Sequence, residues 1–467
     1  MRNLRVFAPV ILALVAAAGC AMKAPPASAP SVPPIPAGFS PQQLADTWDR
    51  ERVSWPVPPL IRHADVETRL KEVRAAAPDF FQLEEIGNSV EGRSLNHIWF
   101  GRGPFHVLLW SQMHGDEPTA TSALFDVFEQ FRRHRDEPAF ALILDSLTIH
   151  AVPMLNPDGA ERFQRRNAQG IDINRDALRL QTPEGRALKA LRDRLNAPVG
   201  FNLHNQGWRT SAGRTGQPAT ISLLSVAFDE ARTESPSRML TKQLCALIRD
   251  ALEPLAPGRV ARYDDEFEVR AFGDNLTKWG TSIVLIETGP WPAAEPDPYL
   301  VRLNFVALMT SLDGLATGRV KQADRRRYET LPINETDLFY LLIRNATVVP
   351  GTGVAPFTAD VGIVANRGVR VVDGTRETRL SARIEDVGDL HVMSALESVD
   401  ASGLLVAPLW DPAMRAGDMV ELPDFAARRA PRVIAPGEPA ELVILRRDGE
   451  RYRVERIIKY EALGAGR

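Results

Sequence analysis

Two side chains that can bind a metal ion, His114 and Glu117, stand three residues apart directly after an apolar run. A second histidine, His204, and a second glutamate, Glu287, also follow apolar runs further along the chain. Two imidazoles and a carboxylate are a common ligand set for zinc, and a further carboxylate can act as a base. Taken singly, each residue has an ordinary explanation as a loop, cap or core residue. Together they predict hydrolysis assisted by a divalent metal.

The elements that would position these residues alternate between strand-like and helix-like runs from about residue 41 to 320. Strand-like runs cover residues 105–111, 147–155, 199–203, 219–226 and 282–286, and helix-like runs cover 118–131, 184–195 and 239–255. This alternation predicts an α/β fold with a mixed sheet flanked by helices. Ligands bind beyond the carboxyl ends of strands in such sheets, so the candidate metal ligands should meet there.

A second polar cluster lies between residues 165 and 176 and includes Arg165, Asn174 and Arg175. Ile171 and Ile173 alternate with polar residues, which predicts a short strand that ends by presenting Asn174 and Arg175. An arginine beside an amide is suited to binding a carboxylate. A solvated loop is the alternative interpretation of this segment.

The order and spacing of these residues resemble the zinc carboxypeptidase family of the carboxypeptidase A and B type. The resemblance covers roughly residues 80–310 and rests on His114-x-x-Glu117, Asn156-Pro-Asp-Gly159, Arg165, Asn174-Arg175, His204 and Glu287. It implies one Zn²⁺ per chain, held by His114, Glu117 and His204.

The resemblance also implies roles for the remaining residues. Glu287 would be the general base, Arg165 would stabilise the oxyanion, and Asn174 with Arg175 would hold the terminal carboxylate of a peptide. The family's substrate-capping tyrosine has no clear counterpart, and Tyr263 is the nearest candidate.

The sequence after about residue 330 changes to short apolar runs separated by turn residues, which predicts an all-β, sandwich-like domain. Residues 337–353, 399–408 and 435–444 resemble the β-sandwich of amidohydrolases, but there is no room for the barrel that carries the catalytic site of those enzymes. We therefore expect a non-catalytic β domain. The small β domain of some regulatory carboxypeptidases is the alternative.

The N-terminus predicts export. Arg2 and Arg5 precede an apolar stretch that ends at Cys20, which resembles the cleavage site of a bacterial lipoprotein. The expected organisation is a signal peptide over 1–19, a Pro/Ala/Ser-rich tether over 20–45, a catalytic domain over 46–330 and the β domain over 331–467. Lipidation of Cys20 would anchor the protein to a membrane in the periplasm or cell envelope. A plain signal peptide with an incidental cysteine is the alternative.

The overall composition limits the choice of partners. A net charge of −3 provides no excess of basic residues to bind nucleic acid. The resemblance to the zinc carboxypeptidases implies a different partner, a peptide with a free C-terminal carboxylate, and the expected export makes a cell-wall peptide one candidate. The predicted function is a metallocarboxypeptidase. The alternatives are a zinc amidase or deacylase acting on small N-acyl or cell-wall substrates, and a binding protein with a vestigial site.

Overall fold

The computed structural model describes residues 38–425, 427 and 432–462, and residues 37–467 form one compact unit. The predicted signal peptide and Cys20 lie outside the described residues. The predicted tether reaches too far, because helix α1 (Pro41–Glu51) already begins at residue 41. Ser40 caps this helix, and its Leu44, Ala45 and Trp48 are buried.

An eight-stranded sheet in the order β1-β2-β4-β3-β5-β9-β7-β8 forms the centre of the N-terminal part. Its strands are β1 (Gln82–Asn88), β2 (Ser94–Gly101), β3 (Phe105–Ser111), β4 (Leu147–Val152), β5 (Val199–Asn205), β7 (Ile221–Ser225), β8 (Val260–Arg262) and β9 (Ser282–Thr288). Strands β4, β3, β5 and β9 are parallel, whereas the pairs β1–β2, β2–β4 and β7–β9 are antiparallel. The predicted mixed sheet is therefore confirmed.

Helices cover both faces of this sheet. One face packs against α1, α2 (His63–Ala76), α3 (Thr119–His134), α4 (Pro138–Ser146), α7 (Pro236–Leu252) and α9 (Asp297–Thr317), and the other packs against α6 (Pro183–Leu195) and α8 (Phe272–Lys278). Short helices α5 (Pro157–Arg162) and α10 (Arg326–Glu329) complete the set, with 3₁₀ turns at Pro58–Leu60, Ile173–Arg175, Gly213–Thr215 and Arg319–Gln322. This three-layer arrangement buries both faces of the parallel strands.

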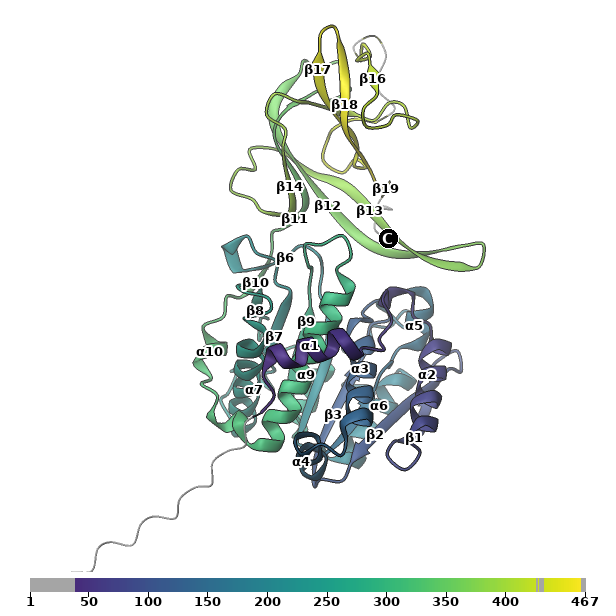
Figure 1. Ribbon diagram of the computed structural model, residues 1–467, viewed down its shortest axis with the longest axis vertical. Coiled ribbons are helices and arrows are strands. Elements are labelled where there is room, and N and C mark those ends of the chain that lie inside the picture. Colours follow the sequence, from purple (N-terminus) through teal and green to yellow (C-terminus); the bar gives the residue numbers. More distant parts are fainter. Residues whose placement is uncertain (1–37, 426, 428–431, 463–467) are drawn as a thin grey trace, which may run out of the picture. The chain divides into compact units, whose positions relative to one another are not determined.

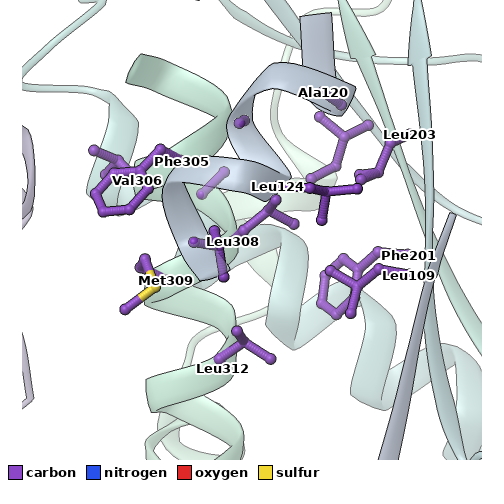
Figure 2. Packing of buried hydrophobic residues seen from close by; sticks show 14 of the residues in the cluster. Leu109, Ala120, Leu124, Phe201, Leu203, Phe305, Val306, Leu308, Met309 and Leu312 are labelled. Atoms are coloured by element: carbon purple, nitrogen blue, oxygen red, sulfur yellow. The ribbon is translucent and has the colours of Figure 1, made fainter. Parts of the chain in front are cut away.

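Helix α9 is the centre of the larger core. Its Phe305, Leu308 and Leu312 lie in the same cluster as Leu124 of α3 and Phe201 of β5 (Figure 2). Among the described residues, α9 is long and apolar enough to cross a membrane, but 78% of its most apolar window is buried inside the protein. Its apolar composition is therefore explained by its central position in the core.

The segment that precedes Arg175 does not form the short strand that its alternating pattern predicts. Residues Ile173–Arg175 form a 3₁₀ turn, and the Asp172 side chain caps it by accepting a hydrogen bond from the Asn174 backbone N–H. The isoleucine alternation reflects burial of Ile173 in the core beside α8 and not strand pairing.

The C-terminal region is rich in strands, as predicted, and its strands join in one nine-stranded sheet. Its order is β16-β18-β17-β15-β11-β12-β13-β19, and β14 also pairs with β11 (Figure 1). The strands are β11 (Phe339–Val348), β12 (Phe357–Val372), β13 (Thr375–Gly388), β14 (Ala395–Asp400), β15 (Leu405–Pro408), β16 (Met419–Val420), β17 (Glu441–Asp448), β18 (Arg451–Lys459) and β19 (Glu461–Ala462).

A small two-stranded sheet joins the two parts of the chain. In it, β10 (Asn334–Thr336) pairs with β6 (Thr210–Ala212), so residues just after the predicted boundary at 330 pair with the N-terminal part. The division into domains at residue 330 stays a prediction.

Candidate metal centre

The candidate metal ligands and Glu287 lie at the carboxyl ends of three neighbouring parallel strands. His204 is the next-to-last residue of β5, and Glu287 lies opposite it on β9. His114 and Glu117 follow β3, which pairs with β5 on its other side. One ligand atom from each of His114, Glu117 and His204 lies within 4.8 Å of the other two.

A tight turn after β3 brings His114 back over the strand ends. Gln112 has a positive φ of 52°, and its side-chain amide donates a hydrogen bond to the Gly115 carbonyl. A Cβ atom at Gly115 would lie 2.0 Å from the carbonyl carbon of Gly159, so only glycine fits where this turn meets α5.

The ring nitrogens of both histidines face the same carboxylate. The Glu117 Oε1 atom is 2.8 Å from His114 Nδ1, and Oε2 is 2.7 Å from His204 Nδ1. The two Nδ1 atoms are 3.2 Å apart. Two buried imidazole nitrogens and a carboxylate directed at one point form the donor set of a zinc site.

Another carboxylate, that of Asp172, contacts the second ring nitrogen of His114. Its Oδ1 lies 3.1 Å from His114 Nε2, and its Oδ2 accepts a hydrogen bond of 3.0 Å from Arg165 Nε. A carboxylate on the second ring nitrogen fixes the orientation of a metal-binding histidine. Sequence analysis missed this residue, although its position two residues before Asn174 was a usable signal.

Burial and charge shift the pKa values of the centre in opposite directions. Burial alone would raise the pKa of Glu117, but His114 and His204 hold it well below its usual range. Burial would lower the pKa of His114, and the charge of Glu117 instead raises it to about 9. Burial lowers the pKa of His204. The Glu117 side chain is therefore negatively charged, and both imidazoles contact its carboxylate.

Glu287 stands apart from these contacts. Its Oε2 atom is buried and has no hydrogen-bond partner among the described residues. Burial and the charge of Glu117 raise its pKa well above the ordinary value. A buried carboxyl oxygen without a protein partner requires a ligand, water or proton to satisfy it.

Arg165 lies beside the metal ligands, with Nη1 at 3.1 Å from His114 Nδ1 and 3.5 Å from Glu117 Oε1. About 43% of its side chain is exposed, so its guanidinium can reach a bound molecule. Asn156 holds the start of this loop by donating to the Arg165 carbonyl. The structure therefore places Arg165 next to the candidate metal ligands.

Asn174 and Arg175 have partners of their own. The Asn174 side-chain oxygen accepts from the Phe272 backbone N–H, which joins the 3₁₀ turn to α8. Arg175 Nε lies 3.2 Å from Glu268 Oε2, and Nη1 donates to the Asn174 carbonyl. Glu268, which sequence analysis missed, partly neutralises the arginine predicted to bind a carboxylate.

Tyr263 is half-buried against the core cluster that contains Trp110 and Phe272. Burial raises its pKa, and the negative charge of Glu287 raises it further. The role of Tyr263 as a substrate cap stays a prediction.

Two buried side chains next to the site have unmet hydrogen-bonding capacity. Neither amide atom of Asn202, two residues before His204, has a partner among the described residues, and the same is true of Trp110 Nε1. Buried polar atoms of this kind are uncommon and often mark places where a ligand or water binds. A polar residue inside the apolar run 199–203 was the available signal in the sequence.

Comparison with known proteins agrees with this geometry. Residues 66–219 match the family model described as zinc carboxypeptidase, which confirms the resemblance to that family and its metal. The matched residues include His114, Glu117, Arg165 and His204 but end before Glu287.

Curated relatives are similar over shorter segments. Carboxypeptidase E of Caenorhabditis elegans is 34% identical over 134 residues, which cover 24% of this chain and 28% of that protein. The catalytic chain of carboxypeptidase N of Rattus norvegicus is 32% identical over 143 residues, covering 26% of this chain and 31% of that protein. The matches thus span less than a third of these relatives' own length.

Solved structures are also similar. A metallo-carboxypeptidase from Pseudomonas aeruginosa aligns with a TM-score of 0.44 and 17% identity, covering 54% of this chain and 69% of that chain. A metallo-carboxypeptidase from Burkholderia cenocepacia aligns with a TM-score of 0.42 and 18% identity, with the same coverage of both chains.

Proposed function

We propose that this chain, whose residues 66–219 match the zinc carboxypeptidase family, removes single residues from the C-terminus of peptides. The observation that carries the proposal is the convergence of His114, Glu117 and His204 within 4.8 Å, with the unpartnered carboxylate of Glu287 on the neighbouring strand.

The two histidines and Glu117 would hold one zinc ion, since their donor atoms and their burial suit that metal. Bound zinc acts as a Lewis acid and lowers the pKa of water. Asp172 would keep the His114 ring in its binding orientation.

Glu287 would move the proton during hydrolysis. As a base, its free oxygen takes a proton from the water whose oxygen attacks the carbonyl carbon of the scissile amide. It then passes this proton to the amide nitrogen as the C–N bond breaks. Arg165 would stabilise the negative charge on the former carbonyl oxygen, and loss of such a donor costs about 2.7–4 kcal/mol.

Asn174 and Arg175 would bind the terminal carboxylate of the substrate and so restrict cleavage to chain ends. Arg175 retains donors beyond its contact with Glu268 because a guanidinium offers five N–H groups. Tyr263, half-buried against the core, would cover the bound residue.

A second candidate, an amidase or deacylase of small N-acyl substrates, is favoured by one observation. Glu268 already pairs with Arg175, which weakens the attraction of that arginine for a substrate carboxylate. An uncharged group could occupy the same position at lower cost.

One experiment separates the two candidates. A mixed library of peptides, each with a free acid or a C-terminal amide, is incubated with the wild type and with Glu287→Gln, and the products are identified by mass spectrometry. A carboxypeptidase removes single residues from the acids only, and Glu287→Gln removes none. Equal cleavage of amides supports the amidase, while internal cuts or equal activity of the variant contradict both candidates.

We also propose that the protein is exported and lipidated at Cys20 in the cell envelope. The support is the apolar stretch and the small residues before Cys20. Expression with a lipid analogue should label the wild type but not Cys20→Ser, and equal labelling of both would contradict lipidation.

A further inference from the structure

A cavity of about 920 Å³ extends from the candidate metal centre to the C-terminal sheet. Glu117, Arg165 and Asn205 line it on one side, and Tyr340 and Tyr460 line it on the other. The residues proposed to hold the terminal carboxylate, Asn174 and Arg175, do not line this cavity. The cavity is therefore separate from the carboxylate site and begins beside Glu117 and Arg165, where it offers space for the rest of a bound peptide.

Specific contacts hold the C-terminal sheet against this cavity. The rings of Trp208 and Tyr340 stack with centroids 5.7 Å apart. Arg209 donates to Glu385 at 2.8 Å. These contacts connect the loop after β5, which carries His204, with strands β11 and β13, so the wall is attached close to the metal ligands.

A bidentate ion pair fixes the opposite side of the cavity. Arg367 of β12 donates to both carboxylate oxygens of Asp297 at 2.6 and 2.7 Å. Asp297 is the first residue of α9, and its carboxylate is buried. A paired, largely buried arginine of this kind gives a rigid attachment.

The wall is aromatic, and its charges are already compensated. Tyr340 and Tyr460 meet edge to face at 5.8 Å, next to Trp208. Besides Arg367, the charged residues that the C-terminal sheet adds to the cavity are Arg456 and Glu397, which pair at 2.6 Å. Aromatic faces without free charge favour aromatic and apolar groups.

We propose that the C-terminal sheet forms a subsite of the substrate cleft, in which Trp208, Tyr340 and Tyr460 bind an aromatic or apolar side chain upstream of the scissile bond. The proposal rests on the proposed carboxypeptidase function, because that function sets the direction of the peptide. The β domain thereby acts in substrate selection although it contributes no metal ligand among the described residues.

Peptide binding tests the subsite directly. Three acetylated peptides share one C-terminal residue: a dipeptide, and two tetrapeptides with Phe or Asp at the two upstream positions. Their dissociation constants are measured by calorimetry with the inactive Glu287→Gln protein. The Phe tetrapeptide should bind best, and adding Trp208→Ala should weaken it about tenfold, the scale of one lost aromatic contact, without affecting the dipeptide.

A matched aromatic control, Trp410, lies just after β15 and does not line the cavity. Trp410 packs against Phe425, so Trp410→Ala should leave all three dissociation constants unchanged. Trp208 lies in a loop, so its replacement should not unfold the protein, and a melting curve checks this.

A second variant should gain a property. Glu397 is exposed, and Glu397→Gln leaves Arg456 without its acidic partner. Binding of the Asp tetrapeptide should then improve about two- to fivefold, the scale of an exposed ion pair.

The results separate the subsite from the enzymatic activity. If the wild type cleaves the dipeptide but Glu287→Gln binds both tetrapeptides equally, the subsite is overturned and the carboxypeptidase stands. If binding depends on Phe and Trp208 but no peptide is cleaved, the carboxypeptidase function is overturned, and with it the position of the subsite upstream of a scissile bond, while the aromatic binding site itself stands. Equal losses for the dipeptide and the Phe tetrapeptide in Trp208→Ala also overturn the subsite.

Discussion

Asp172 shows how one residue outside the expected ligand set can control the site. It is the partner of His114 Nε2 and of Arg165 Nε, so it orients both a ligand and a catalytic candidate. Asp172→Asn keeps the shape but loses the charge. We expect zinc affinity to fall about 10- to 100-fold, as measured by competition with a chelator.

A second buried aspartate provides the control. Asp176, four residues further on, accepts hydrogen bonds from the Gln181 and Thr182 backbones and does not touch the metal ligands. Asp176→Asn should reduce stability and leave zinc affinity unchanged. Equal zinc affinity of Asp172→Asn and the wild type would remove Asp172 from the centre.

At the scale of elements, the turn between β3 and α3 determines whether the site can form. A methyl group at Gly115 would overlap the backbone of Gly159 at 2.0 Å. Gly115→Ala should therefore lower the free energy of unfolding by about 1–3 kcal/mol and also weaken zinc binding. Chemical denaturation and zinc titration measure the two effects.

Gly207 is a suitable comparison for this substitution. It lies near the same centre, and no atom lies within 4 Å of a Cβ built there. Gly207→Ala should change stability by less than about 0.5 kcal/mol. The same small effect in Gly115→Ala would show that the turn can adjust.

Three neighbouring strands carry a row of hydrogen-bonded histidines that are not metal ligands. His150 of β4 lies 3.0 Å from His97 of β2 and 2.9 Å from His106 of β3, and Glu84 of β1 accepts from His97. Burial lowers the pKa of His97 to about 4 and that of His150 to about 3.

This row predicts a pH dependence of stability. Between pH 6.5 and about 4 the unfolded chain binds more protons at His97 and His150 than the folded protein does. The contribution of these two histidines to stability is therefore complete above pH 6.5 and falls as the pH decreases, by up to about 1.4 kcal/mol per pH unit for each histidine. Urea unfolding of zinc-free protein from pH 7 to 4 measures this slope.

Replacing His150 by Gln should flatten the slope, because it removes one of the two groups. His391→Gln is the control, since His391 is exposed in the turn between β13 and β14, with 73% of its side chain accessible. An unchanged slope in His150→Gln would exclude the row as its cause.

Short continuous apolar runs and helices with one apolar face were predictable from the sequence, and elements with neither pattern were not. The run 105–111 matches β3, and 184–195 matches α6 within one residue. Helix α9 was not predicted because it is buried on nearly all sides and has no polar face that would reveal a helical period in the sequence. Strands β1 and β2 were not predicted because polar residues are common in them.

The same distinction applies to the site. The metal ligands lie at or just after the ends of strands, so the local sequence is enough to identify them as candidates. The contact of Asp172 with His114 joins residues 58 positions apart, and that of Glu268 with Arg175 joins two loops. Such pairings depend on loop paths, which the local pattern does not determine.

At the scale of the whole molecule, Arg376 attaches the β12–β13 hairpin to the N-terminal part. It is buried and donates to the backbone carbonyls of Pro59, Ile61 and Ala160. Arg376→Ala leaves these acceptors without their partner, so we expect a loss of about 1.5–3 kcal/mol in the free energy of unfolding.

Chemical denaturation measures this loss, with Arg446→Ala as the control. Arg446 is exposed on β17, and its side chain pairs with Glu455 of β18. Its replacement should cost less than about 0.5 kcal/mol. Equal stability of the two variants would show that the hairpin contact does not stabilise the fold.

Zinc titration of the full-length protein tests the central claim most directly. The account predicts that the wild type binds one zinc ion per chain, and that His204→Ala binds it at least about 100-fold more weakly while keeping its fold. His391→Ala, which removes an exposed histidine, should bind zinc like the wild type. A wild type that binds no stoichiometric zinc, or a His204→Ala variant with unchanged affinity, would contradict the account.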